Sequence, residues 1–287
     1  MATTRPNQEG FHRLLDAVHA ILLHYGLTLP DLVVAVQLVE LPVGVTCFGA
    51  LTIDAQGQIV SGQMPLLKGE PWDTYVDLWI AKLKDRLIES DQSPLLKGWR
   101  DSGIRDRINK YLSDGVRNML ETAEVNQKVL THGDLTLNNL LYDSDAKCIT
   151  GLLDFDWAAV THPCDEFLFR LWVICSGINE RVGKLQPHVL SGDFSQQPVD
   201  LSEEEKRMWD IAKAWEGALA RRGAIRPSTI AGVDRIQALR DLEELLCPFA
   251  LASEVMLGRI SDAEKAAKKE EVEIKICPVG LAADEAV

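Results

Sequence analysis

The pattern of hydrophobic and polar positions predicts a chain made mainly of amphipathic helices. Large apolar residues recur at every third or fourth position over long stretches, a spacing that places them on one face of a helix. One stretch, residues 166–174, is apolar nearly all round, which is typical of a buried central helix. Helices are therefore expected at residues 8–25, 72–89, 104–120, 166–174, 203–222 and 229–246, and in a short segment that opens at residue 261.

End signals support two of these helices. Ser202 and Glu205 form the sequence of a capping box, which opens a helix that Gly223 is expected to close. Pro248 ends the helix expected at 229–246, because proline cannot continue a helix without losing a hydrogen bond. Residues 32–39 leave two possibilities open. Their β-branched side chains favour a buried strand, and a second helix is the alternative.

Two β-hairpins are predicted among the helices. The first pairs residues 48–54 with residues 59–62 around a turn that contains Gly57. The second places short apolar runs within residues 130–142 and 149–157 on either side of the polar turn 143–147. Polar residues lie at both outer ends of this second hairpin, so a rigid scaffold would bring them together.

The outer ends of the second hairpin carry candidate chemistry. Asp134, Asn139 and Asp154 supply two carboxylates and an amide, all of which offer oxygen atoms. Oxygen ligands suit Mg²⁺, which usually takes few ligands from the protein and completes its shell with water and substrate phosphates. Turn and helix-cap roles are the alternative explanation for acids and amides between strands.

These motifs resemble those of a known family. A His-Gly-Asp sequence with an Asn five positions after the Asp, followed by Asp-Phe-Asp after a short hairpin, is similar to the aminoglycoside phosphotransferase and choline kinase branch of the protein-kinase-like fold. The resemblance covers residues 45–250. It implies an α+β, mainly helical fold, namely a kinase-like C-terminal lobe whose short hairpins carry the catalytic motifs.

The resemblance also implies a role for each motif residue. Asp134 would accept the proton of the substrate hydroxyl as ATP donates its γ-phosphate, while Asn139 and Asp154 would bind Mg²⁺. His132, within the catalytic motif, would shape the loop together with Gly133. Asp165 matches the family's helix-capping aspartate and would brace the same loop.

The small N-terminal lobe of such kinases is not evident in the sequence. No Val-Ala-Ile-Lys-like strand precedes the first hairpin, and the first lysine is Lys68. We therefore predict a helical N-terminal segment at residues 1–45 (a vestigial lobe or linker), a kinase-like catalytic lobe at 46–275, and a frayed acidic tail at 276–287. The face left bare by a missing lobe would be available to another chain, which could form an oligomer or supply the lost lobe.

Three functions remain open on this basis. The first is a small-molecule phosphotransferase that uses Mg²⁺ and ATP. The second is an enzyme of other chemistry that uses Asp134 and Asp154 as an acid–base pair, since close carboxylates push each other's pKa values apart. The third is a pseudokinase that only binds a partner, which the retention of Asp134, Asn139 and Asp154 disfavours.

The composition and charge of the chain restrict which kinds of molecule it is expected to bind. The formal net charge of −13 argues against nucleic acid or an anionic membrane, because both are polyanions. The six cysteines show no paired metal-ligand spacing, and no apolar run forms a signal core or a membrane span, so a cytoplasmic protein is expected. An acidic groove lined by tryptophans would suit a cationic or amphiphilic substrate, although a solvated acidic face is the commoner explanation. The tryptophans in question are Trp72, Trp79, Trp99, Trp172, Trp209 and Trp215.

Overall fold

The computed structural model describes residues 40–64, 67–101, 103–135, 139–143, 145, 148–167 and 184–276. The helix expected at 8–25, the segment 32–39, most of the helix expected at 166–174 and the tail from 277 lie outside the described residues. The chain divides into two compact units. Unit 1 comprises Met1–Tyr75 and Glu124–Val233, and unit 2 comprises Val76–Ala123 and Asp234–Val287. The domain bounds predicted from the sequence stay a prediction.

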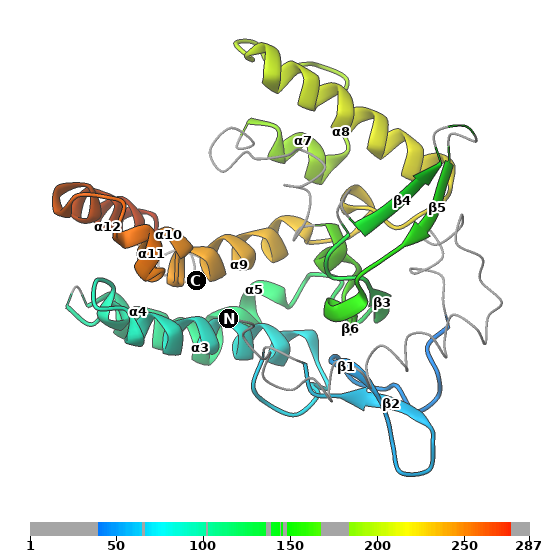
Figure 1. Ribbon diagram of the computed structural model, residues 1–287, viewed down its shortest axis with the longest axis horizontal. Coiled ribbons are helices and arrows are strands. Elements are labelled where there is room, and N and C mark those ends of the chain that lie inside the picture. The colour runs from blue at the N-terminus through cyan, green and yellow to red at the C-terminus, as the bar shows by residue number, and fades with distance from the viewer. Residues whose placement is uncertain are drawn as a thin grey trace. The chain divides into compact units, whose positions relative to one another are not determined.

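Unit 1 contains three small antiparallel sheets among its described residues, each made of two strands. Both predicted hairpins are present, and Figure 1 shows the second one, β4–β5, in green. A further pair, β3–β6, joins the outer ends of the segment that carries the motifs, and the sequence pattern did not predict it. The strands are β1 (Ala50–Ile53) with β2 (Ile59–Gly62), β3 (Val129–Thr131) with β6 (Ala159–Thr161), and β4 (Leu140–Asp143) with β5 (Cys148–Leu152).

Isolated bridges connect the first hairpin to the motif segment. Gly49 pairs with Val160 of β6, and Phe48 pairs with Trp72. The apolar side chains of these strands then share one buried cluster, which gives the motif segment a rigid support. The buried members of the cluster are Val45, Ala50, Leu51, Leu130, Leu152, Phe155, Ala158 and Val160.

The helical part of unit 1 follows the motif segment. The predicted capping box is confirmed, because the Ser202 hydroxyl accepts from the Glu205 backbone N–H while the Glu205 carboxylate accepts from the Ser202 N–H at 2.6 Å. A cluster around Trp209 and Phe194 packs α8 onto α7, a helix that the sequence pattern did not predict. The helical segments are η6 (Phe155–Trp157), α7 (Gln186–Ser191), α8 (Glu203–Arg221) and η8 (Pro227–Thr229).

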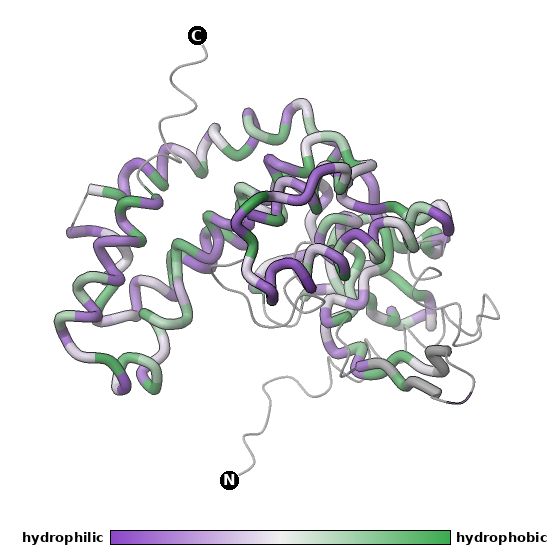
Figure 2. Tube along the Cα trace, turned by 90° about the horizontal axis from the view of Figure 1, so that it is seen from above, coloured by the Kyte–Doolittle hydropathy of each residue, from purple (hydrophilic) through white to green (hydrophobic). Residues whose placement is uncertain are grey.

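The described part of unit 2 is helical. Its apolar faces are buried, and Figure 2 shows hydrophilic and hydrophobic residues alternating along the helical segments as amphipathic helices require. The indole N–H of the buried Trp99 donates to the Leu246 carbonyl at 2.7 Å, which ties the η3 turn to the end of α9. The helices are α3 (Tyr75–Gln92), η3 (Lys97–Trp99), α4 (Ile104–Lys110), η4 (Tyr111–Gly115), α5 (Val116–Leu120), α9 (Val233–Leu246), α10 (Phe249–Ala252), α11 (Glu254–Leu257) and α12 (Asp262–Ile276).

The predicted fold class, α+β and mainly helical, is confirmed. Three predicted helices differ from the structure. The helix expected at 229–246 begins at Val233, and the separate 3₁₀ turn η8 occupies Pro227–Thr229. The helix expected to begin at Trp72 begins at Tyr75, because the backbone of Trp72 is engaged with Phe48 in a β-bridge. The helix expected at 104–120 contains a π-helical turn, η4, in its middle. No helix in the described ranges has the length and apolar character needed to cross a membrane.

Candidate active site

The loop that follows β3 is organised by the side chain of His132. Its Nδ1 accepts from the backbone N–H of Asp134 at 3.2 Å, and its Nε2 lies 2.8 Å from the Leu153 carbonyl oxygen. A carbonyl only accepts, so Nε2 carries the proton and Nδ1 is the acceptor. The buried ring also packs on Phe155, with 4.9 Å between ring centroids. One neutral imidazole thus links Asp134 to the residue that precedes Asp154.

Asn139, at the C-terminal end of the same loop, forms hydrogen bonds that close the loop. Its Nδ2 donates to the Asp134 backbone carbonyl at 2.8 Å and to Asp134 Oδ2 at 3.2 Å. The backbone carbonyl of Asn139 accepts from the Leu153 backbone N–H at 2.8 Å. Because the amide nitrogen faces Asp134, the Oδ1 atom of Asn139 is turned the other way. The spacing of five residues between Asp134 and Asn139 therefore produces a closed loop with both side chains on one side.

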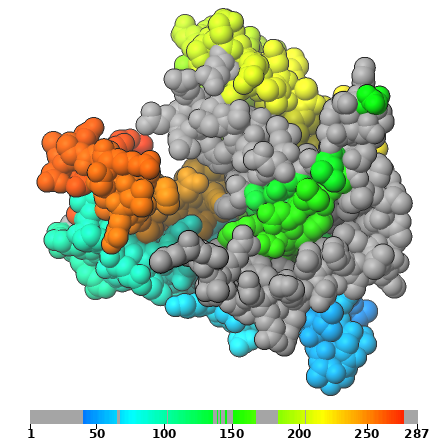
Figure 3. All heavy atoms as spheres, in the orientation of Figure 1, coloured from blue at the N-terminus to red at the C-terminus, as the bar shows by residue number. Residues whose placement is uncertain are grey.

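Asp154 follows β5 in an unusual backbone conformation. Its φ of 61° and ψ of 69° lie in the left-handed region, which is costly for a residue other than glycine. It is the N-terminal cap of η6, and its side chain is exposed. Figure 3 shows green spheres, the colour of the middle of the chain, at the surface on the face in view. A strained, exposed carboxylate on a rigid hairpin is typical of a functional position.

Gly133 allows the two motif segments to approach each other. Its φ of +74° is left-handed, and a Cβ built on it would lie 2.4 Å from the Trp157 carbonyl oxygen. That oxygen belongs to the backbone of η6, which cannot turn aside as a flexible side chain would. Only glycine therefore fits between His132 and Asp134 while η6 stays in place.

The buried side chain of Glu166 binds the backbone of the loop that follows β3. Glu166 was not identified from the sequence as a site residue. Its Oε2 accepts from the His132 backbone N–H at 2.5 Å, and the side chain is only 8 % exposed. The predicted brace, Asp165, instead accepts from the Tyr75 hydroxyl at 2.8 Å. The bracing role of Asp165 stays a prediction. The sequence signal for Glu166 is an acid in an otherwise apolar run, a residue type that is buried only when it is paired.

Replacing Glu166 by Leu is expected to destabilise unit 1 by about 1–3 kcal/mol, because the buried His132 N–H loses its acceptor. Glu166→Gln keeps an acceptor oxygen and should retain most of the stability. Urea denaturation of both variants measures the difference. Equal stability of the two variants would show that the contact with His132 is unimportant.

Burial sets the protonation of the groups behind the loop. It lowers the pKa of His162, partly offset by the Asp165 carboxylate and the backbone of Glu124. Burial also raises the pKa of the Cys164 thiol well above its usual value. Both groups are thus neutral at physiological pH, and the His162 ring packs on Tyr75 at 4.9 Å between centroids. They form a support for the site and not a charged part of it.

The donor atoms of the motif fit a hard divalent ion. Asn139 Oδ1 and the Asp154 carboxylate offer oxygen, and a hydrogen bond from the Leu153 N–H to the backbone carbonyl of Asn139 holds the two segments together. Within the described ranges, no group of three or more His, Cys, Asp and Glu side chains could hold a metal ion. A site with two protein ligands is what Mg²⁺ uses when phosphate oxygens complete its shell, whereas zinc prefers Cys and His.

The sequence also matches the model of a known protein family. Residues 48–191 match the family model of the phosphotransferase enzyme family. The chain belongs to this family. The matched range contains His132, Asp134, Asn139, Asp154 and Asp165, so the resemblance noted from the motifs is confirmed. Comparison with individually curated proteins gives no match. Membership implies a phosphotransferase in the broad sense, and kinases of this family generally use ATP and Mg²⁺.

Proposed function

We propose that this phosphotransferase transfers the γ-phosphate of ATP to a hydroxyl group of a small molecule, with Asp134 as the general base. The observation that carries the proposal is the chain of hydrogen bonds from Asp134 through His132 to Leu153. It couples the loop of the base to the backbone beside Asp154. Phosphoryl transfer needs little from a protein except positioning and charge neutralisation, and this arrangement supplies positioning.

Asp134 would take the proton that leaves the substrate hydroxyl as its oxygen attacks the γ-phosphorus. The Asn139 amide keeps the Asp134 carboxylate in one orientation through its 3.2 Å bond to Oδ2. His132 holds the Asp134 backbone in the same way from the other side. The base is therefore fixed by two neighbours before substrate arrives, which reduces the entropy lost on reaching the transition state.

Asn139 and Asp154 would hold the Mg²⁺ of the nucleotide, which when bound neutralises charge on the phosphates. The exposed position of Asp154 leaves its carboxylate accessible to a metal–nucleotide complex. Asp134, which Asn139 holds by a hydrogen bond, would act on the substrate hydroxyl and not on the metal ion. This division of labour supports phosphoryl transfer over an acid–base pair of Asp134 and Asp154, in which the two carboxylates would need a shared site.

The substrate we favour is cationic or amphiphilic, but the residues that support this differ from those first considered. Trp79, Trp99 and Trp209 are buried in the core and cannot line an open groove. Trp157, three residues after Asp154, is 42 % exposed. An exposed indole near carboxylates suits a cation through its π face. Such a substrate and a cytoplasmic location are proposals, the latter supported by the free thiols of Cys47, Cys164 and Cys247.

Titration calorimetry with Mg²⁺ and a non-hydrolysable ATP analogue tests the proposal. Wild type should bind the pair, and omission of Mg²⁺ should weaken binding. Asp154→Asn removes a charged metal ligand and should lower metal affinity by about tenfold or more. The control is Asp156→Asn, which removes a charge from the same turn.

Two outcomes would contradict the proposal. Turnover of the substrate by wild type with chelator present and without nucleotide would favour acid–base chemistry of another kind. Absence of both nucleotide binding and turnover would favour a binding protein without catalytic activity.

A further inference from the structure

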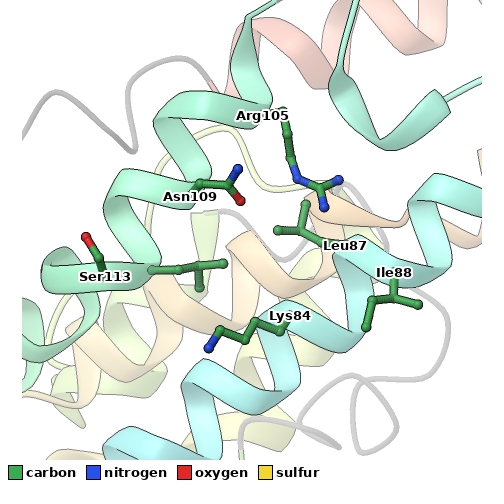
Figure 4. Close-up of a pocket in the computed structure, with 7 residues that line it drawn as sticks. Lys84, Leu87, Ile88, Arg105, Asn109 and Ser113 are labelled. Atoms are coloured by element: carbon green, nitrogen blue, oxygen red, sulfur yellow. The ribbon is translucent and has the colours of Figure 1, made fainter.

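A pocket in unit 2 is lined by residues of α3, α4 and η4, and none of them belongs to the phosphotransferase motif. Its volume is about 380 Å³, within the range of small-molecule sites. Figure 4 shows side chains from α3 facing those from α4 across the space. The lining residues are Lys84, Leu87, Ile88, Arg105, Asn109, Leu112 and Ser113.

The charge of this pocket differs from that of the chain as a whole. The protein has 43 acidic and 30 basic residues, yet the lining contains two cations and no carboxylate. Lys84 stands on α3 and Arg105 on α4, and Figure 4 shows the Lys84 side chain directed away from Arg105, so an anion contacts both when the flexible Lys84 side chain turns toward the guanidinium group. An anion between them would be attracted by both.

Arg105 is held in position before any ligand binds. Its Nη1 donates to Asp91 Oδ1 at 3.0 Å and to the Gly98 carbonyl at 3.1 Å, and its Nη2 donates to Asp91 Oδ2 at 3.3 Å. These bonds leave the Nε–H and one Nη2 hydrogen without an acceptor in the described ranges. The side chain is 17 % exposed, so it keeps access to solvent while most of it is packed.

Asp91 does not cancel the positive charge of Arg105. Its Oδ1 also accepts from Arg100, with Nε at 3.1 Å and Nη2 at 2.9 Å. Burial opposes ionisation of Asp91, but the hydrogen bonds from Arg105 and Arg100 outweigh it and lower the pKa of the carboxyl group. One carboxylate is thus shared by two guanidinium groups, and the trio keeps a net positive charge.

Lys84 supplies the second charge without a competing acid. It is exposed, and no described residue forms an ion pair or hydrogen bond with its ammonium group. Asn109 and Ser113 add polar groups on the opposite wall, one turn apart. The Ser113 hydroxyl oxygen lies 2.7 Å from the Lys110 carbonyl oxygen and 3.0 Å from Oδ2 of Asp114, which is not a lining residue, and these two acceptors fix its position.

The floor of the pocket is apolar and its wall is irregular. Leu87 and Leu112 are buried, while Ile88 is half exposed at the edge. The wall changes from α-helix to the π-helical turn η4 at Tyr111, and π-helical turns occur frequently at functional sites. Gly115 permits this turn, because a Cβ there would lie 2.2 Å from the Tyr111 ring.

We propose that the pocket between α3 and α4–η4 binds a small amphipathic anion, with a carboxylate between Lys84 and Arg105 and a short apolar body on Leu87 and Leu112. The size of the pocket limits the ligand to a small metabolite. The proposal does not depend on the phosphotransferase assignment, because the pocket lies wholly in unit 2 and the catalytic motif lies in unit 1.

The probe is 3-phenylpropionate, followed by NMR of leucine and isoleucine methyl groups in the full chain. Its carboxylate is unsuited to the acidic motif of unit 1, which reduces competing binding. We expect dissociation constants of about millimolar, as usual for so small a ligand, with shifts at the methyl groups of Leu87, Ile88 and Leu112. The neutral analogue 3-phenyl-1-propanol should bind about tenfold more weakly, because it lacks the charge-assisted hydrogen bonds.

Two variants and a control locate the binding. Lys84→Glu should weaken binding of 3-phenylpropionate about tenfold or more without disturbing the fold, since Lys84 is exposed. Arg105→Gln should also weaken it, with circular dichroism as a check because Arg105 holds Asp91. Lys213→Glu makes the same charge change on the exposed face of α8 and should leave binding unchanged.

The proposal fails if the methyl groups of Leu87, Ile88 and Leu112 do not respond to 3-phenylpropionate, or if only distant methyl groups respond. It also fails if the alcohol binds as well as the carboxylate, or if Lys84→Glu and Lys213→Glu behave alike. Loss of nucleotide binding in the Asp154→Asn variant would leave these results unaffected, so the two proposals are tested separately.

Discussion

Replacing Asp134 by Asn is expected to lower the rate of phosphoryl transfer by about 10²–10⁴-fold, the usual contribution of a general base. The asparagine keeps the size of the side chain and an oxygen that can accept from Asn139, so the loop should hold its shape. What is lost is the capacity to take the hydroxyl proton. Steady-state kinetics with saturating Mg²⁺ and ATP measure the loss as a fall in kcat.

Asp145→Asn is the matched control, because Asp145 is an exposed residue in the turn between β4 and β5. It makes the same change of charge in the segment between β3 and β6 and should leave kcat unchanged. Thermal unfolding should give equal midpoints for both variants. Normal turnover by Asp134→Asn would remove Asp134 from the role of base.

Local signals predicted much of the fold. The capping box at Ser202 and the glycine in the β1–β2 turn each depend on a few neighbouring residues, so sequence alone identifies them. The pairing of β3 with β6 joins residues about thirty positions apart, as in Val129 opposite Thr161. No local pattern specifies that partner, because three-residue strands carry too little periodicity.

The candidate site likewise combines features that depend on local sequence with features that depend on tertiary packing. The spacing of Asp134 and Asn139 is a local property of the sequence, and the structure joins the two residues by hydrogen bonds, whereas their roles in catalysis and metal binding stay predictions. The contact of Glu166 with His132 depends on how the helical segment after β6 packs under the loop, which spacing cannot show. The tryptophans show that a sequence pattern can also suggest a site where the structure places core residues. Trp79, Trp99 and Trp209 were expected to line a substrate groove, but they are buried in the core.

Gly133 and Asp154 both adopt a left-handed backbone conformation, but for different reasons. Gly133 adopts the left-handed conformation where the Trp157 carbonyl passes close to its Cα. Asp154 adopts the left-handed conformation on the facing segment despite its side chain. Glycine is needed where space is short, whereas Asp154, which is exposed, has room for its Cβ. The identity of each residue thus follows from its surroundings and not from φ alone.

Gly133→Ala is therefore expected to be far more damaging than the same substitution at Gly57. Both glycines have left-handed φ, +74° and +77°, so both variants bear the cost of about 1–2 kcal/mol for an L-residue in this region. A Cβ at Gly57 meets nothing within 4 Å, whereas one at Gly133 lies 2.4 Å from the Trp157 carbonyl oxygen. Relieving that contact adds about 1–3 kcal/mol.

The movement that relieves the contact also separates the loop of Asp134 from η6 and Asp154. Gly133→Ala should thus lose phosphotransferase activity even at temperatures where it stays folded, while Gly57→Ala should keep activity and lose only a little stability. Urea denaturation and kinetics on the two variants decide the matter. If both variants lose the same stability and both remain active, the close approach of Gly133 to Trp157 does not hold the site together, and the motif segments must be positioned by the β4–β5 pairing alone.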